Sequence, residues 1–207
     1  MVRYEKNNSA ENQTNEKCLR GEKKMPTSEI VEYCAPTLAG IKTGSLFSIR
    51  NNDRNYVVQR LRKLNHLMRQ YGLRIVPLKY AKDYTLIYVY RPKYLDKDLH
   101  DPRAIDILNE NGYSDKNADL CVCHLVKRLK DSADFPHEIG LFLGYPPEDV
   151  KGFINNPNVG VKYVGCWKVY GDKKNALMRF KLINKCTEIY KEKVRCGIPL
   201  EELMVKT

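Results

Sequence analysis

The sequence lacks any apolar run that approaches the ~20 residues of a membrane-spanning helix. Its first residues, MVRYEKNNSAENQTNEK, also lack the apolar segment of a secretion signal. These two absences predict a cytoplasmic protein with no membrane partner. The 207 residues, 43% hydrophobic and 29% charged, are enough for one globular domain with a buried core.

Recognisable metal and nucleotide signatures are missing as well. The seven cysteines are odd in number and irregularly spaced, and none forms a CxxC pair, so we expect reduced thiols and no metal ligands. The run Cys121, Cys123 and His124 does not have the spacing of a structural zinc site. No HExxH and no GxxxxGK[ST] sequence occurs, which excludes the zinc-protease and P-loop signatures.

Positive charge is abundant but unevenly distributed. The net charge is +11, and residues 50–93 hold eleven Lys and Arg against two acids, Asp53 and Asp83. Residues 94–160 hold seven basic residues against twelve acids. This distribution predicts one strongly basic face and a mildly acidic region elsewhere.

The order of predicted elements indicates an α+β fold. Residues 1–25 are polar and predict a flexible tail, whereas 26–207 predict a single α+β domain. Within it we expect strands near 45–49, 73–80, 84–90 and 161–170, and helices near 28–35, 55–71, 102–111, 117–131 and 172–195, with a turn near 92–98. This order predicts a ferredoxin-like βαββαβ domain. Its four-stranded, mostly antiparallel sheet would carry an enlarged helical insertion before the last strand. Pro77 places its strand at an edge or a bulge.

The stretch FPHEIGLFLGYPPEDVKGFI, residues 135–154, predicts two short helices joined by a tight turn. Gly144 suits the end of the first helix, and Pro146 and Pro147 suit the start of the second. A DNA-binding helix-turn-helix has this outline, but Glu148 and Asp149 would then face phosphates. We therefore favour a helical hairpin used for packing.

Three motifs together carry a resemblance to a known family. They are CAPTLAGIKTGSLFSI (34–49), the 135–154 stretch and GCWKVY (165–170). The chain resembles an uncharacterised family of small bacterial proteins, a domain of unknown function, over roughly residues 28–196. The resemblance implies a genomic context of ferrous-iron transport and flavodoxin genes, and hence a link to iron or redox metabolism. It supplies no reaction and no catalytic residue.

The same motifs contain the best candidates for a ligand site. We expect a pocket where CAPTLAGIK meets the FPHEIG helix start, with Cys34, Lys42, His137 and Glu138 as polar groups and Trp167 as a wall. Such a pocket would bind a small ligand, a cofactor or a metal. The alternatives are a helix cap for His137 and Glu138 and simple packing for the cysteine. No set of residues is complete enough to predict an enzyme.

The basic segment 50–93 suggests a second kind of function. Tyrosines alternate there with cations, and the candidate anion-binding residues on its helix are Arg60, Arg62, Lys63 and Arg69. This surface could bind single-stranded nucleic acid or an acidic redox protein such as a flavodoxin. No RGG run and no RNP-like motif occurs, so we favour a solvated helix face over nucleic-acid binding.

Overall fold

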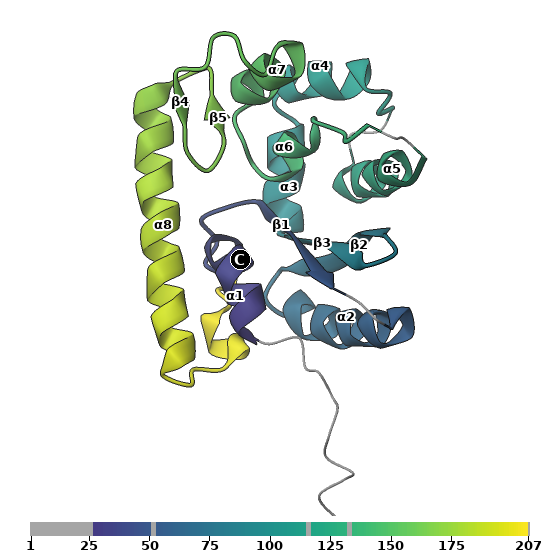
Figure 1. Cartoon of the computed structure of the whole chain (residues 1–207), viewed down its shortest axis with the longest axis vertical. Coiled ribbons are helices and arrows are strands. Elements are labelled where there is room, and N and C mark those ends of the chain that lie inside the picture. Colours follow the sequence, from purple (N-terminus) through teal and green to yellow (C-terminus); the bar gives the residue numbers. More distant parts are fainter. Residues whose placement is uncertain (1–26, 51–52, 115–116, 132–133, 207) are drawn as a thin grey trace, which may run out of the picture.

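The fold was examined in a computed structural model, which describes residues 27–50, 53–114, 117–131 and 134–206. The tail expected at 1–25 lies outside these residues. The first half of the chain forms α1 (Thr27–Leu38), β1 (Gly44–Arg50), α2 (Arg54–Arg69), β2 (Arg74–Tyr80), β3 (Tyr84–Tyr90), α3 (Pro92–Leu99) and α4 (Pro102–Glu110) (Figure 1). The second half forms α5 (Ala118–Asp131), α6 (Ile139–Phe142), α7 (Pro147–Asn155), β4 (Tyr163–Val164), β5 (Lys168–Val169), α8 (Lys173–Arg195) and the 3-10 turn η1 (Leu200–Leu203).

The central sheet has three antiparallel strands in the order β1-β3-β2. Strand β3 lies in the middle, and its register with β1 runs from Gly44 opposite Tyr90 to Arg50 opposite Tyr84. Strand β2 is an edge strand, and its register with β3 shifts between Pro77 and Lys79. Both the edge position and the bulge that Pro77 suggested are confirmed. The physical reason is that proline has no backbone N–H to donate to the hydrogen bonds between strands.

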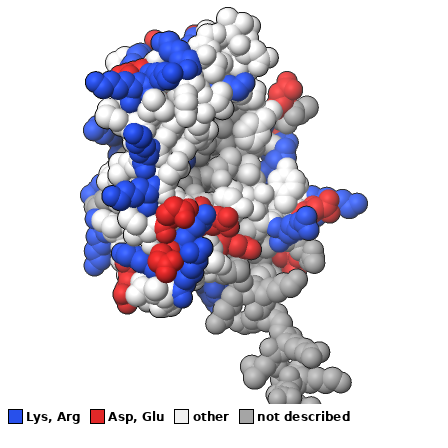
Figure 2. Space-filling model, turned by 60° about the vertical axis from the view of Figure 1, so that its left-hand side comes forward, with Lys and Arg blue, Asp and Glu red and all other residues white. Residues whose placement is uncertain are grey.

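Helices cover both faces of this sheet (Figure 1). Ile87 and Val89 of β3 belong to a core shared with α1, α2 and α8, whereas Tyr88 and Tyr90 belong to a core shared with α3, α4, α5 and α6. Alternate residues of a strand point to opposite faces, so β3 is buried on both sides. Helix α8 stands along one flank of the molecule, and Lys and Arg side chains spread over that flank (Figure 2).

The ferredoxin-like prediction is wrong, because the expected fourth strand does not join the sheet. Residues 163–169 form a separate hairpin of two-residue strands, β4 and β5. The Asp149 carboxylate explains this, since it accepts from Trp167 Nε1 at 2.7 Å and from the backbone N–H groups of Tyr170 and Gly171 at 2.7 and 2.8 Å. These bonds hold the segment against α7, and Trp167 also packs on Phe180 of α8. The broader prediction of a fold that contains both α-helices and β-strands is confirmed.

The turn expected near 92–98, at the start of a mainly helical region, extends to the eight-residue helix α3. Pro92 occupies its first turn, where a missing N–H costs nothing. Leu95 and Leu99, four residues apart, are both fully buried. The helix is thus stabilised by packing on the sheet.

Side-chain caps begin two of the expected helices. Asp53 and Asp172 cap α2 and α8, accepting from the N–H groups of Asn55 and Asn175 at 2.8 and 3.0 Å. Two short helices, α6 and α7, form the hairpin of 135–154, and Gly144 between them has a φ of 73°. In the described residues no helix has the length and apolar character to cross a membrane.

Candidate functional site

One cleft of the described residues lies where four parts of the chain meet. It has a volume of about 550 Å³ and is bordered by the α1–β1 loop, α3, the α6–α7 turn and α8. Its lining includes Ile41, Thr43, Tyr94, Lys97, Asp98, Asp101, Leu141, Gly144, Tyr145, Pro147 and Arg179. This volume is within the range of sites for small molecules.

The α1–β1 loop is tightly folded at the edge of this cleft. The Pro36 carbonyl accepts from the N–H groups of both Ile41 and Lys42, at 2.8 and 3.1 Å, so the chain reverses as α1 ends. The Thr43 hydroxyl then donates to the Asp98 carboxylate of α3. The CAPTLAGIKTG and LGYPP motifs meet here, because a Cβ added to Gly144 would lie 2.7 Å from Thr43 Oγ1.

Aromatic side chains support the side of the cleft nearest α8. The Tyr145 ring stacks on Trp167 with centroids 4.7 Å apart, and Trp167 meets Phe180 edge-on at 4.5 Å. Because Asp149 also holds the indole N–H, the Trp167 ring is fixed in one orientation. Trp167 therefore lies behind Tyr145, which itself lines the cleft.

Two cations line the cleft, Lys97 and Arg179, and neither forms an ion pair with a carboxylate in the part of the chain that the structure describes. Lys42 also lacks such a partner and lies beside Tyr145 without lining the cleft. Arg179 donates to the Gly144 carbonyl at 2.9 Å and lies over Trp167, with Cζ 5.3 Å from the ring centroid. Lys42 Nζ lies 5.3 Å from the Tyr145 centroid. Burial lowers the pKa of Lys42 to about 8, and the nearby Arg179 adds to this effect.

The two carboxylates of the cleft are already engaged. Asp98 accepts from Thr43, and burial raises its pKa. Asp101 caps α4 and pairs with Arg103 at 2.7 Å, and this hydrogen bond lowers the pKa of Asp101. Arg179 and Lys97 oppose the rise in the pKa of Asp98, so they act on this carboxylate through space without forming an ion pair with it.

The cysteines near the cleft differ in exposure. Cys34 is fully buried, and burial raises the pKa of its thiol far above the usual range, so it stays protonated at neutral pH. Cys166 is exposed, and burial raises its pKa while the Lys42 ammonium opposes that rise. No group of three or more His, Cys, Asp or Glu suited to a metal ion occurs within 27–50, 53–114, 117–131 and 134–206.

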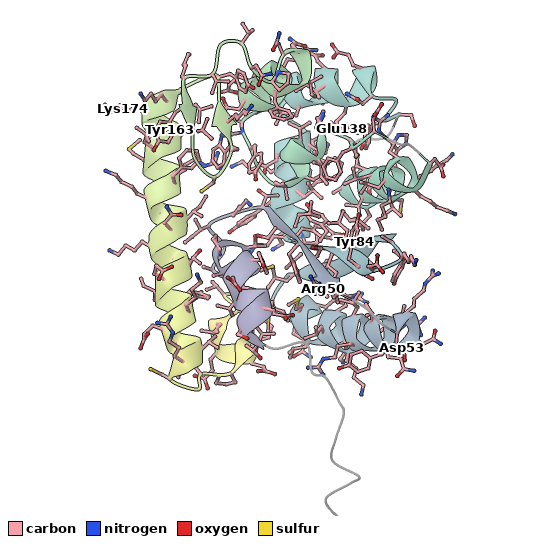
Figure 3. The ribbon with its side chains drawn as sticks, viewed as in Figure 1. Arg50, Asp53, Tyr84, Glu138, Tyr163 and Lys174 are labelled. Carbon is pink, nitrogen blue, oxygen red and sulfur yellow. The ribbon has the colours of Figure 1, made fainter. Side chains whose placement is uncertain are left out.

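His137 and Glu138 lie on the other side of α6. Glu138 points towards α5 (Figure 3), where it accepts from the Tyr113 hydroxyl at 3.0 Å and pairs with Arg128 at 2.7 Å. His137 is exposed and packs edge-on against Phe153 with centroids 5.0 Å apart. The structure thus places Lys42 near Cys34 and beside Tyr145, which stacks on Trp167, and it places His137 and Glu138 elsewhere. None of these five predicted residues lines the cleft itself.

The basic segment 50–93 divides between surface and core. Arg62, Lys63 and Arg69 of α2 are exposed and Arg60 is half-buried, but none of the four lines the cleft. Tyr88 and Tyr90 are buried, which removes two of the rings that could have stacked bases. A further cation of the segment, Arg91, is fully buried.

Sequence reasoning missed Thr43, Asp98, Tyr145 and Arg179 as members of one site. Thr43 and Tyr145 lie within motifs that were recognised, but the other two carry no local signal. Asp98 and Arg179 are ordinary charged residues on helices, separated by 81 positions from one another. Only the packing of α8 against α1 brings them to one cleft.

A model of the family described as "Protein of unknown function (DUF3793)" matches residues 30–204. The chain belongs to this family. This match confirms the resemblance to a domain of unknown function that the sequence motifs indicated. No curated protein and no solved structure matches it.

Proposed function

We propose that this DUF3793 protein binds a small anionic molecule in the cleft between the α1–β1 loop, α3, the α6–α7 turn and α8. The observation that carries the proposal is that Arg179 lines this cleft, with Lys42 close to it, and that neither forms an ion pair with a carboxylate among the described residues. A guanidinium presents several donors in a planar fork, which suits carboxylate and phosphate groups.

The walls of the cleft restrict the shape and polarity of the part of the ligand that is not anionic. Tyr94, Leu141 and Tyr145 supply apolar surface beside the charged groups. A small molecule with a flat or apolar body and one anionic group matches this combination. Anionic organic cofactors belong to the same chemical class, and the proposal includes no reaction.

Trp167 provides a direct assay, because it is the only tryptophan of the chain and Arg179 lies over its ring. We would titrate the protein with inorganic phosphate, citrate and a mononucleotide, recording tryptophan fluorescence and the melting temperature. Binding should shift both signals for at least one of these probes.

The matched variants are Arg179→Gln and Lys181→Gln, which remove one cation each from the same helix. Arg179 lines the cleft, whereas Lys181 is exposed on α8 outside it. Arg179→Gln should weaken binding about tenfold or more, because a charged hydrogen bond is lost. Lys181→Gln should leave it unchanged. Equal affinity of both variants, or no response to any probe, would contradict the proposal.

A further inference from the structure

The outer side of α8 carries apolar side chains that face solvent. Met178, Leu182 and Ile189 are 57%, 52% and 45% exposed, and Val164 of the adjacent β4–β5 hairpin is 63% exposed. Positions 178, 182 and 189 are four and seven residues apart, a spacing that places them along one side of a helix. They form an exposed apolar stripe, here called the α8 stripe.

Lysines without ion-pair partners border the α8 stripe. Lys174, Lys181 and Lys185 are exposed, and none forms a salt bridge with a described residue. The acids of α8 lie nearer its C-terminus and are paired locally, Glu188 with Lys191 at 3.6 Å and Glu192 with Arg195 at 3.0 Å. Figure 2 shows the same division, with basic side chains along the flank and acidic ones gathered towards the lower part.

We propose that the α8 stripe docks an acidic amphipathic helix of a partner protein. Apolar residues of the partner would cover Met178 and Leu182, and its carboxylates would pair with the flanking lysines. A 23-residue helix is about 35 Å long, which gives a second helix room to pack along several turns. Helix-in-groove recognition uses such regularly spaced anchors.

The charges and the apolar groups favour this partner over two others. Nucleic acid would pair with the lysines but would leave Met178 and Leu182 without a role. A second copy of the chain would bring Lys181 and Lys185 close to the same lysines of its partner.

The test uses a designed 21-residue helical peptide with Leu at heptad positions a and d and mainly Glu elsewhere. Its binding to the full chain is followed by fluorescence anisotropy at low and at physiological salt. A peptide of the same composition with scrambled order, which has no apolar face, is the peptide control. The amphipathic peptide should bind at least about tenfold more tightly than the scrambled one, and salt should weaken it.

Protein variants distinguish binding at the α8 stripe from nonspecific binding to exposed apolar residues elsewhere. Leu182→Glu should reduce peptide affinity about tenfold or more, because it removes an apolar anchor and adds a repelling charge. Leu120→Glu on α5 is the matched control, since Leu120 is also 50% exposed, and it should change nothing. Circular dichroism checks that both variants are folded.

Four outcomes would overturn the proposal. They are equal binding of the two peptides, equal affinity of Leu182→Glu and wild type, dimerisation of the free chain that Leu182→Glu abolishes, and binding to phosphatidylserine vesicles that depends on Leu182. Arg179→Gln, which tests the cleft, leaves the α8 stripe intact. The failure of one proposal is therefore distinguishable from the failure of the other.

Discussion

At the scale of single residues, Arg91 has the largest structural role of any charged side chain described here. It is fully buried, and its guanidinium donates to the carbonyls of Thr37, Leu38, Tyr71 and Val205 at 2.7, 2.6, 3.3 and 2.9 Å. Three separate segments are tied together by one side chain. Burial lowers the pKa of Arg91, yet arginine keeps its proton in proteins.

Replacing Arg91 by Met should therefore destabilise the fold strongly. The variant leaves buried carbonyls without their donors, and we expect a loss of about 3 kcal/mol or more in the free energy of unfolding. Urea unfolding followed by circular dichroism measures this loss. The control is Arg62→Met on the exposed side of α2, where we expect a change within about 0.5 kcal/mol. Similar losses in the two variants would show that the buried bonds contribute little.

Lys42 should make stability depend on pH with a definite sign. Its pKa is about 8 in the folded state against 10.5 in the reference state, so the unfolded chain binds more protons between these values. The free energy of unfolding should then rise as the pH increases from about 8 to about 9, by up to about 1 kcal/mol.

Lys42→Met removes this contribution, and urea unfolding at both pH values measures it. Other groups titrate in wild type and variant alike, so the difference between the two chains isolates Lys42. An equal pH dependence of both chains, or a steeper rise in the variant, would contradict the assigned burial of the amine.

At the scale of elements, the α6–α7 turn depends on a glycine for two reasons. Gly144 has a φ of 73°, and a Cβ there would lie 2.7 Å from Thr43 Oγ1. Gly112, after α4, has a similar φ of 80° but no atom within 4 Å of such a Cβ. The two positions share the backbone requirement, and only Gly144 adds a steric one.

Alanine at both positions separates these effects. Gly112→Ala should cost about 1–2 kcal/mol, the penalty of a left-handed conformation. Gly144→Ala should cost more and should displace Thr43, so it should also weaken ligand binding in the cleft. Urea unfolding and the tryptophan titration measure both properties. Equal costs with unchanged ligand binding would mean that Thr43 adapts without effect.

At the scale of the whole molecule, β3 lies at the centre of two cores. It pairs with strands on both sides and is covered by helices on both faces. Its amides should therefore exchange with solvent deuterium only on global unfolding, slower than any other described segment. Strands β4 and β5, with two residues each, should exchange much faster. Hydrogen-exchange mass spectrometry tests this order, and comparable protection of the two sheets would contradict it.

Short-range patterns predicted much of the local structure. The helix expected near 55–71 followed from its apolar spacing, which depends on neighbours within a few residues, and the structure has it as α2. The strands at β2 and β3, the edge or bulge at Pro77 and the paired short helices followed for the same reason. The count of charges over 50–93 predicted a basic face less reliably, because it could not show that the Arg91 side chain would be buried in the core.

Local patterns in the sequence were sufficient to predict these elements and to recognise the family, because such signals lie between residues close in the chain. The departure of 161–170 from the sheet depends on tertiary contacts, since the Asp149 carboxylate that holds this segment comes from another element. The same applies to the cleft, where α8 brings Arg179 to Lys42 and Tyr145. These contacts join segments far apart in sequence, and their free energy depends on packing that no local pattern records.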